Sequence, residues 1–219
     1  MPPLLTLTMT TTEITTPAET INLLSSMYLC KPSLTAVENW KGALAEDTSI
    51  FLADLRKAIS GIDLTSEEVR EDLLWEYTRL FIGPYKLPCP PWESVYTSPK
   101  RLIMQDAAGN VVKLYHEAGL TLETADVMPD HIGAELNFLA VLLQRMHSEK
   151  NEKDGSMRIT KKLLNDHLLK WMPEFTRDLE GAAESSFYKA LARATRDVID
   201  FVGRECCEED GGARHYDSV

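Results

Sequence analysis

The stretch from Leu80 to Tyr96, LFIGPYKLPCPPWESVY, constrains the fold of this chain more than any other part of its sequence. Gly83 and Pro84 are typical of residues that end a preceding helix. The stretch is nevertheless as apolar as a core, and an ordered loop of this kind either binds a partner or fills the interior. Its four prolines lack a backbone donor and fix φ, so we expect neither a helix nor a central strand to pass through it: Pro84, Pro88, Pro90 and Pro91.

Composition limits the classes of partner. The 219 residues carry a net charge of −11, which argues against binding to nucleic acid or to an anionic membrane surface. A basic ligand or peptide is favoured if a charged partner exists. No stretch approaches the roughly 20 apolar residues that span a membrane, and the N-terminus lacks the basic region of a secretory signal. We therefore expect a cytoplasmic protein with no membrane insertion.

Cysteine usage does not indicate a metal site or a disulfide scaffold. The four cysteines, Cys30, Cys89, Cys206 and Cys207, lack CxxC pairing. The vicinal pair Cys206–Cys207 lies in a polar tail, where it is either an incidental reduced pair or redox-active.

Helical periodicity accounts for the rest of the chain, and no segment shows strand alternation. Thr16-Pro17-Ala18-Glu19 reads as a capping box that opens the first helix. The pattern predicts an all-α, single-domain helical bundle over residues 16–203 with a long Pro-rich loop. We expect residues 1–15 to be a disordered tail and 204–219 a polar tail.

Around and after the loop the expected elements are less regular. The sequence predicts these elements: a short helix over 99–104, a turn over 106–110, helices over 111–118, 129–147 and 156–171, a new helix from Pro173, and a last helix over 186–203. Ile132, Leu136, Leu139 and Leu143 should form the core face of the 129–147 helix. The charged loop Asn151–Gly155 is a candidate hinge.

The MPDH motif at 128–131 is the second feature with candidate chemistry. Asp130 suits the first turn of a helix, where it complements the macrodipole. His131 and Glu135 are spaced i, i+4 and could share a metal, although no third ligand has matching spacing. A metal-dependent enzyme centred on Asp130, His131 and Glu135 is one open alternative. Motifs for a nucleophilic serine and for phosphate binding are absent, so we expect no catalytic residue, resident metal or bound cofactor.

Three motifs in this order resemble the TorD/DmsD family of redox-enzyme maturation chaperones, and the first is closest to its DmsD-like branch. They are LFIGPYKLPCPPWESVY, MPDHIGAEL, and NDHLLKWMPEF followed by SSFYKAL. The resemblance implies an all-helical cytoplasmic protein. It also implies binding to the twin-arginine leader and the body of a molybdopterin-containing oxidoreductase until its cofactor is inserted, which delays export.

The resemblance also implies a peptide-binding site, with Leu80, Phe81, Pro91, Trp92, Asp130 and His131 as its first residues. Tyr77 falls where DmsD-like members carry a tryptophan, and Glu93, Ser94 and Tyr96 are second candidates.

Within the loop, we expect Trp92, Pro91 and Phe81 to contact the client, and Leu87 and Val95 to face the core.

A twin-arginine leader has a basic pair followed by an apolar stretch. A proline-stiffened apolar groove beside Asp130 and Glu93 would complement both parts of such a leader. The identity of the client oxidoreductase is open, and a scaffold for a leaderless cytoplasmic subunit is a further alternative. We expect a monomer, with a domain-swapped dimer, known for this fold, as the other state.

Overall fold

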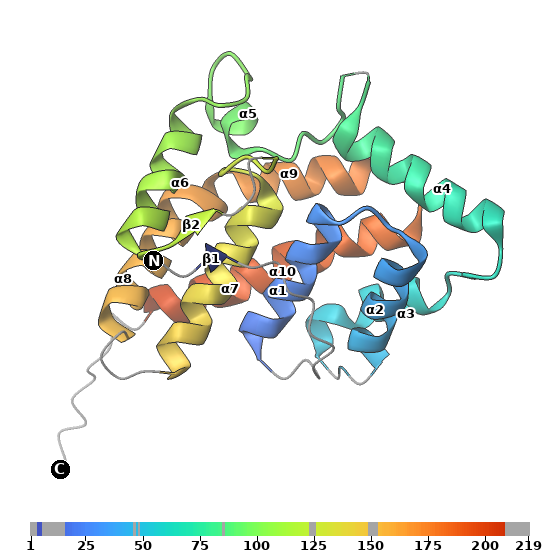
Figure 1. Ribbon diagram of the computed structural model, residues 1–219, viewed down its shortest axis with the longest axis horizontal. Helices are drawn as coiled ribbons and strands as arrows, with labels where there is room; N and C mark the ends of the chain where they lie inside the picture. The colour runs from blue at the N-terminus through green and yellow to red at the C-terminus, as the bar shows by residue number, and fades with distance from the viewer. Residues whose placement is uncertain are drawn as a thin grey trace, which may run out of the picture.

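The computed structural model describes residues 16–45, 47, 49–84, 86–122, 126–148 and 153–208, and the backbone of Leu4–Leu5. Predictions for the rest of the N-terminal tail, for Tyr85, for the start of the predicted hinge and for residues 209–219 lie outside these residues. Within them the protein is helical, and the all-α prediction is confirmed (Figure 1). Among the described helices, none combines the length and the apolarity needed to cross a bilayer.

Helical elements follow one another along most of the described chain, with short turns between them. In order they are α1 Pro17–Leu29, α2 Leu34–Ala45, the 3-10 turn η1 Ile50–Leu52, α3 Ala53–Ser60, α4 Glu67–Tyr77, the π-helical turn η2 Thr78–Ile82, α5 Glu93–Thr97, α6 Asp106–Glu117, α7 Ile132–Ser148, α8 Lys153–Lys162, the π-helical turn η3 Leu163–Leu168, α9 Leu169–Ala182 and α10 Ser186–Glu208.

One minimal sheet accompanies these helices. Strand β1, Leu4–Leu5, pairs in parallel with β2, Thr121–Leu122. This pairing could not be predicted, because two residues are too few to show an alternating pattern. This short pairing leaves the all-α prediction intact.

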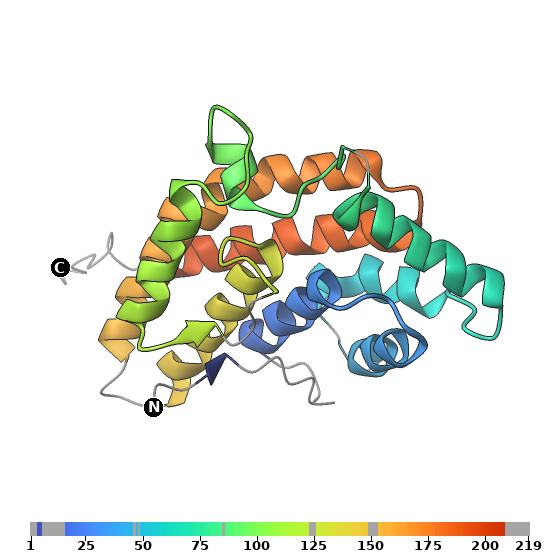
Figure 2. The same cartoon turned by 45° about the horizontal axis from the view of Figure 1, so that its top comes forward.

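The core forms where α1 packs against α7, and where α9 and α10 run side by side (Figures 1 and 2). Gly133 allows α1 and α7 to approach, because a Cβ there would clash with Cγ of Leu29. Ser25 Oγ donates a 2.7 Å hydrogen bond to the carbonyl of Gly133 at this contact. The predicted core face of α7 is confirmed, since all four of its residues are buried: Ile132, Leu136, Leu139 and Leu143.

The start of α1 follows the predicted capping box. Thr16 Oγ1 accepts from the backbone N–H of Glu19 at 3.3 Å, and the Glu19 carboxylate accepts from the Thr16 backbone N–H at 2.9 Å. Two donors that the helix leaves unpaired are thereby satisfied. This terminus is readable from sequence because every partner lies within one turn.

Elements next to the Pro-rich segment differ from the prediction. The segment ends in a short helix, α5, whereas the predicted helix over 99–104 is an irregular loop with positive φ at Arg101 (50°) and Met104 (56°). The predicted turn over 106–110 is the first turn of α6. These elements differ from the prediction because α5 is capped by a residue distant in sequence, Asp130.

The C-terminal third also differs from the prediction. Pro173 lies inside α9 rather than at the start of a new helix. The predicted charged loop ends early, because α8 already begins at Lys153. Helix α10 continues to Glu208, so Cys206 is a buried helical residue and not part of a polar tail. The Cys207 side chain lies outside the described part of the chain.

Candidate functional site

The Pro-rich segment is joined to the start of α7 by its backbone. Trp92 and His131 form an antiparallel bridge. The N–H of Ile132 donates to the Pro91 carbonyl, and the N–H of Glu93 donates to the Asp130 carbonyl, each at 2.9 Å. The prolines supply acceptors but no donors, so this pairing uses the hydrogen-bonding capacity that they retain. The two motifs that the sequence paired as one site are thus neighbours in space.

Asp130 caps the helix α5 that follows this bridge. Its carboxylate Oδ2 accepts a 2.9 Å hydrogen bond from the backbone N–H of Ser94, in the first turn of α5. Trp92, the residue immediately before α5, makes no side-chain capping hydrogen bond. A negative charge at a helix N-terminus is stabilising. The sequence predicted that Asp130 caps its own helix, and the structure shows it capping another one.

Ser94 extends the same chain of contacts to the next loop. Its hydroxyl oxygen accepts a 3.1 Å hydrogen bond from the backbone N–H of Gln105. This bond closes the loop over 98–105, in which Arg101 and Met104 take the left-handed conformation that side chains rarely adopt. The same loop exposes three large apolar side chains, Leu102, Ile103 and Met104. Strained backbone of this kind persists only where its surroundings hold it, and functional sites are common among such places.

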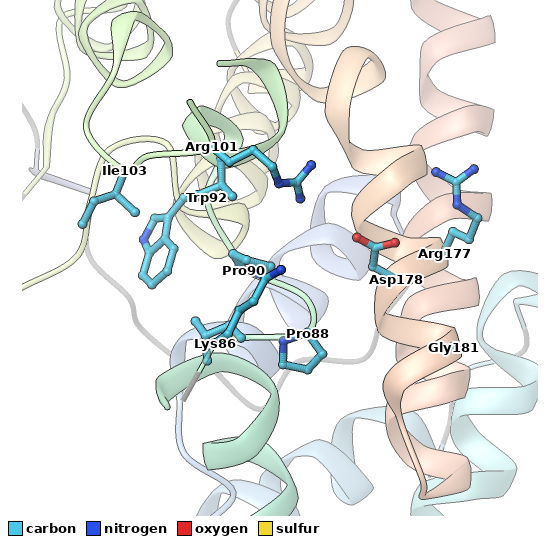
Figure 3. A pocket seen from close by; sticks show the side chains of 11 residues that line it. Lys86, Pro88, Pro90, Trp92, Arg101, Ile103, Arg177, Asp178 and Gly181 are labelled. Atoms are coloured by element: carbon cyan, nitrogen blue, oxygen red, sulfur yellow. The ribbon is translucent and has the colours of Figure 1, made fainter. Parts of the chain in front are cut away.

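A groove of about 930 Å³ lies between the Pro-rich segment, this loop and α9. Its apolar lining comes mainly from Leu87, Trp92, Val95 and Ile103, and its charges come from both walls. In Figure 3, Trp92 and Ile103 stand on one side and Arg177 and Asp178 project from α9 on the other. The complete lining is Lys86, Leu87, Pro88, Pro90, Trp92, Val95, Arg101, Ile103, Arg177, Asp178 and Gly181. We call this feature the proline groove.

The charges of the proline groove are mixed. Lys86, Arg101 and Arg177 line it together with one carboxylate, Asp178. The Arg101 guanidinium lies 5.3 Å from the centre of the Tyr96 ring. Burial, followed by the nearby charge of Asp178, raises the pKa of Tyr96, so this phenol stays neutral at physiological pH. Cations and apolar surface therefore dominate the walls of the groove.

The structure distributes the predicted peptide-binding residues over three environments. Tyr77, Leu80 and Phe81 lie in the core. The Phe81 ring packs edge-on against Tyr77 and Tyr188 at 5.3 and 5.9 Å. The Tyr77 hydroxyl donates to the Tyr28 carbonyl at 2.9 Å. The expectation that Phe81 contacts the client therefore does not match its place in the core, where the end of α4 meets α1 and α10.

A second group is buried and polar. Glu93, Ser94 and Asp130 are at most 3% exposed, so neither carboxylate is presented to a leader arginine. Pro91 is buried as well, and it contributes its carbonyl to the bridge. Because each of these groups completes an internal hydrogen bond, their role in this structure is to hold the groove in shape.

The third group is partly buried around the groove. Trp92 lines it and is partly buried, and Tyr96 is partly buried beside it, packed 5.5 Å from the Trp171 ring. His131 packs edge-on against Trp92 at 6.2 Å. Leu87, expected in the core, lines the groove, and Val95 is buried but also reaches its wall. Trp92 is thus the predicted residue that the structure places most directly at the groove.

A buried polar cluster lies behind the groove. Glu93 Oε2 lies 2.7 Å from His167 Nδ1, and Trp171 Nε1 donates to Glu135 Oε2 at 3.1 Å. One potential ligand atom each of Glu93, Glu135 and His167 lies within 4.8 Å of the others. Among the described residues this trio is the group spaced for a metal ion, and Asp130 and His131 do not belong to it. The described residues therefore do not bring Asp130, His131 and Glu135 together as one metal-ligand group.

His131 has a different role from that of a ligand. Its Nδ1 accepts a 3.1 Å hydrogen bond from the backbone N–H of Gly133 in the first turn of α7. Burial lowers the pKa of His131 to about 4, so the ring is neutral near pH 7.

Residues 41–177, more than half of the chain, match the family described as "Nitrate reductase delta subunit". The chain belongs to this family. The resemblance to TorD/DmsD proteins is confirmed, because relatives of this chain carry those names. A Tat proofreading chaperone DmsD of Salmonella typhi is 33% identical over 58% of each chain. A chaperone protein TorD of Photobacterium profundum is 28% identical over 62% of this chain and 63% of its own. The chain thus spans about three fifths of these relatives.

The fold of this family member also has a solved counterpart. A crystal structure from Archaeoglobus fulgidus, named as a candidate redox enzyme maturation protein, superposes with a TM-score of 0.58 at 22% identity. The match covers 87% of this chain and 96% of that one. At this identity the likeness supports the fold.

Several residues of the proline groove were not predicted from the sequence. These residues line the groove but follow the end of the Pro-rich segment by 5 to 85 positions: Arg101, Ile103, Arg177, Asp178 and Gly181. In the sequence, Arg177 and Asp178 are indistinguishable from the solvent-exposed charged residues of an amphipathic helix. The exposed run at 102–104 was the one available signal, since three consecutive large apolar residues at the surface suggest a contact site.

Proposed function

We propose that this protein is a cytoplasmic, enzyme-specific chaperone. It binds the twin-arginine leader and the body of a molybdopterin-containing oxidoreductase subunit, assists cofactor insertion and delays export. Family membership and the names of the relatives support this proposal. Residues 16–203 form the chaperone domain, which acts as a monomer and carries no catalytic residue.

The proline groove is the observation that carries the proposal. Its prolines preset an extended surface, so little conformational entropy is lost when a peptide docks. Leu87, Trp92 and Ile103 offer apolar surface to the apolar stretch of a leader. Burial of such surface gives roughly 25 cal/mol per Å², which makes apolar contact the main source of affinity. The exposed side chains of Leu102 and Met104 extend this surface beyond the groove.

Recognition of the arginine pair needs an accessible carboxylate. Glu93 and Asp130 are buried, which leaves Asp178 as the acidic side chain in the groove lining. Asp178 is our candidate for contact with one leader arginine. An exposed ion pair adds only about 0–1 kcal/mol, so its loss should weaken binding far less than loss of the tryptophan. The net charge of −11 also attracts a basic leader at long range.

Calorimetry with a synthetic leader tests the proposal. The leader should come from the oxidoreductase encoded beside this protein's gene. We expect wild type to bind it and Trp92→Ala to bind about 30-fold or more weakly, since a buried aromatic hot spot costs about 2 kcal/mol or more. The matched control is Trp75→Ala, because Trp75 is 58% exposed on α4 and does not line the proline groove.

Two outcomes would refute leader binding at the groove. One is no detectable binding of any such leader by wild type. The other is equal affinity of Trp92→Ala and Trp75→Ala.

The basic side chains of the groove favour one second candidate. Because Lys86, Arg101 and Arg177 outnumber Asp178, the groove suits an apolar segment without an arginine pair. The protein would then be a scaffold for a leaderless cytoplasmic subunit. In that case a client without its leader would bind as tightly as the full-length client, whereas the first proposal expects a clear loss.

A further inference from the structure

The buried cluster behind the groove brings together side chains from three separate elements. Glu93 comes from α5, Glu135 from α7 and His167 from the π-helical turn η3. All three are at most 5% exposed, and one ligand atom of each lies within 4.8 Å of the others. From this geometry we propose that Glu93, Glu135 and His167 bind one divalent transition-metal cation, of which zinc is the first candidate.

The two buried carboxylates of the cluster need either a cation or a proton to offset their charge. Among the described residues, no lysine or arginine hydrogen-bonds to these two buried carboxylates. Glu93 contacts the His167 ring, and Glu135 accepts from the Trp171 indole. The Oε1 atom of Glu135 is buried and accepts no hydrogen bond, and neither does Oδ1 of the fully buried Asp130. Buried carboxylates are stable only when they are paired, protonated or bound to a metal. A cation would supply the missing charge.

A shared proton is the competing solution. Burial, and then the neighbouring Glu93 charge, raise the pKa of Glu135 well above its usual range. The protonated carboxyl of Glu135 could then donate to Glu93. A proton and a cation are alternatives at this place, because a metal ligand must be deprotonated.

The ligand types suit a borderline-soft cation. One imidazole nitrogen and two carboxylate oxygens match donor sets for zinc and other divalent transition metals, with ligand distances of about 2.0–2.2 Å. Two ligands at a tetrahedral angle lie about 3.3 Å apart, so Glu93 Oε2 and His167 Nδ1 would separate from 2.7 Å by roughly half an ångström. Three protein ligands leave a fourth position for water.

The surroundings already orient these ligands. Trp171 Nε1 holds Glu135 Oε2, as outer hydrogen bonds hold metal ligands elsewhere. His167 lies in a π-helical turn, a local widening that occurs frequently at functional sites. The cation would connect α5, and therefore one wall of the proline groove, to α7 and η3. The site stands independently of the proposed chaperone function, because it depends only on groups inside the bundle.

Metal content of the full chain tests the proposal. The protein is stripped with a chelator, dialysed against zinc and measured by elemental analysis, with a thermal melt at each step. We expect one equivalent of zinc and a higher melting temperature in wild type. Glu135→Gln should lose the equivalent and the thermal shift, or bind at least tenfold more weakly. Its amide oxygen can still accept from Trp171, so the variant keeps the internal hydrogen bond.

Matched controls separate this site from adventitious ligands. His116→Ala removes an exposed histidine, and Cys206→Ser with Cys207→Ser removes the vicinal thiols. Each control variant should keep the zinc equivalent. If Glu135→Gln does not fold, the optical spectrum of cobalt-loaded wild type decides, since the proposed ligands are nitrogen and oxygen and exclude thiolate charge-transfer bands.

Four results would overturn the proposal. They are absence of bound zinc in wild type, retention of the equivalent by a folded Glu135→Gln, its loss in the cysteine variant, and thiolate bands in the cobalt spectrum. Absence of zinc together with an unchanged or more stable Glu135→Gln would assign the cluster to a shared proton.

Discussion

The Asp130 carboxylate accepts a 2.9 Å hydrogen bond from the backbone N–H of Ser94, 36 positions earlier in the chain. This bond joins the MPDH motif to the short helix at the end of the Pro-rich segment. With the Trp92–His131 bridge, it fixes one wall of the proline groove to the start of α7. The two motifs are therefore one structural unit, and the polar members of that unit point inward.

Replacement of Asp130 should destabilise the fold. We expect Asp130→Ala to lower the free energy of unfolding by about 1–3 kcal/mol, because the buried N–H of Ser94 loses its acceptor. Asp130→Asn should cost less, since its amide oxygen can still accept. Urea unfolding measures both, with the exposed Asp126→Ala as the control near zero. A wild-type value for Asp130→Ala would contradict the capping role.

Phe81 and Leu87 should separate stability from binding. Phe81 is 3% exposed in the core, so Phe81→Ala should cost about 3–5 kcal/mol of unfolding free energy. Leu87 lines the groove and is partly buried, so Leu87→Ala should change stability by about 1 kcal/mol or less and weaken leader binding. Denaturant melts and calorimetry on the two variants check this. Equal stability losses would place Leu87 in the core after all.

Acid should destabilise the protein through His131. Burial lowers the pKa of His131 from 6.5 to about 4, so between these values the unfolded chain binds a proton that the folded chain does not. Stability is therefore lost as pH falls from about 6.5 to about 4, by up to about 3 kcal/mol. His131→Asn should flatten this part of the curve. The difference between the wild-type and variant urea curves isolates His131 from other titrating groups, and parallel curves would disprove its contribution.

Gly133 should resist substitution because of Leu29. A Cβ at Gly133 would overlap the Leu29 side chain, so Gly133→Ala should cost about 1–3 kcal/mol. Combination with Leu29→Ala should recover part of that loss, which a double-mutant cycle measures. Gly109→Ala is the matched control, because nothing lies within 4 Å of its added Cβ in α6, and it should be neutral or stabilising. An additive cycle would locate the cost elsewhere.

Local signals carried most of the fold prediction. The Thr16–Glu19 capping box and the core face of α7 were readable because their partners lie within a few turns of the same helix. Pro173 misled the reading of α9, since proline usually marks a helix start or end. In the structure it follows closely after the π-helical turn η3, and the helix continues past it.

For the candidate site too, local features were predictable from the sequence, whereas contacts between distant residues were not. The apolar, proline-stiffened stretch followed from the sequence, because composition and backbone chemistry are local properties. Its pairing with the MPDH motif followed from the family resemblance. Whether a side chain faces the groove or the core was decided by packing. Phe81 and Leu87 exchanged their expected places, and Glu93 and Asp130 turned inward to partners 74 and 36 positions away. Hydrogen-bond partners this far apart in sequence produce no periodic pattern of residues, so only the tertiary structure could assign them.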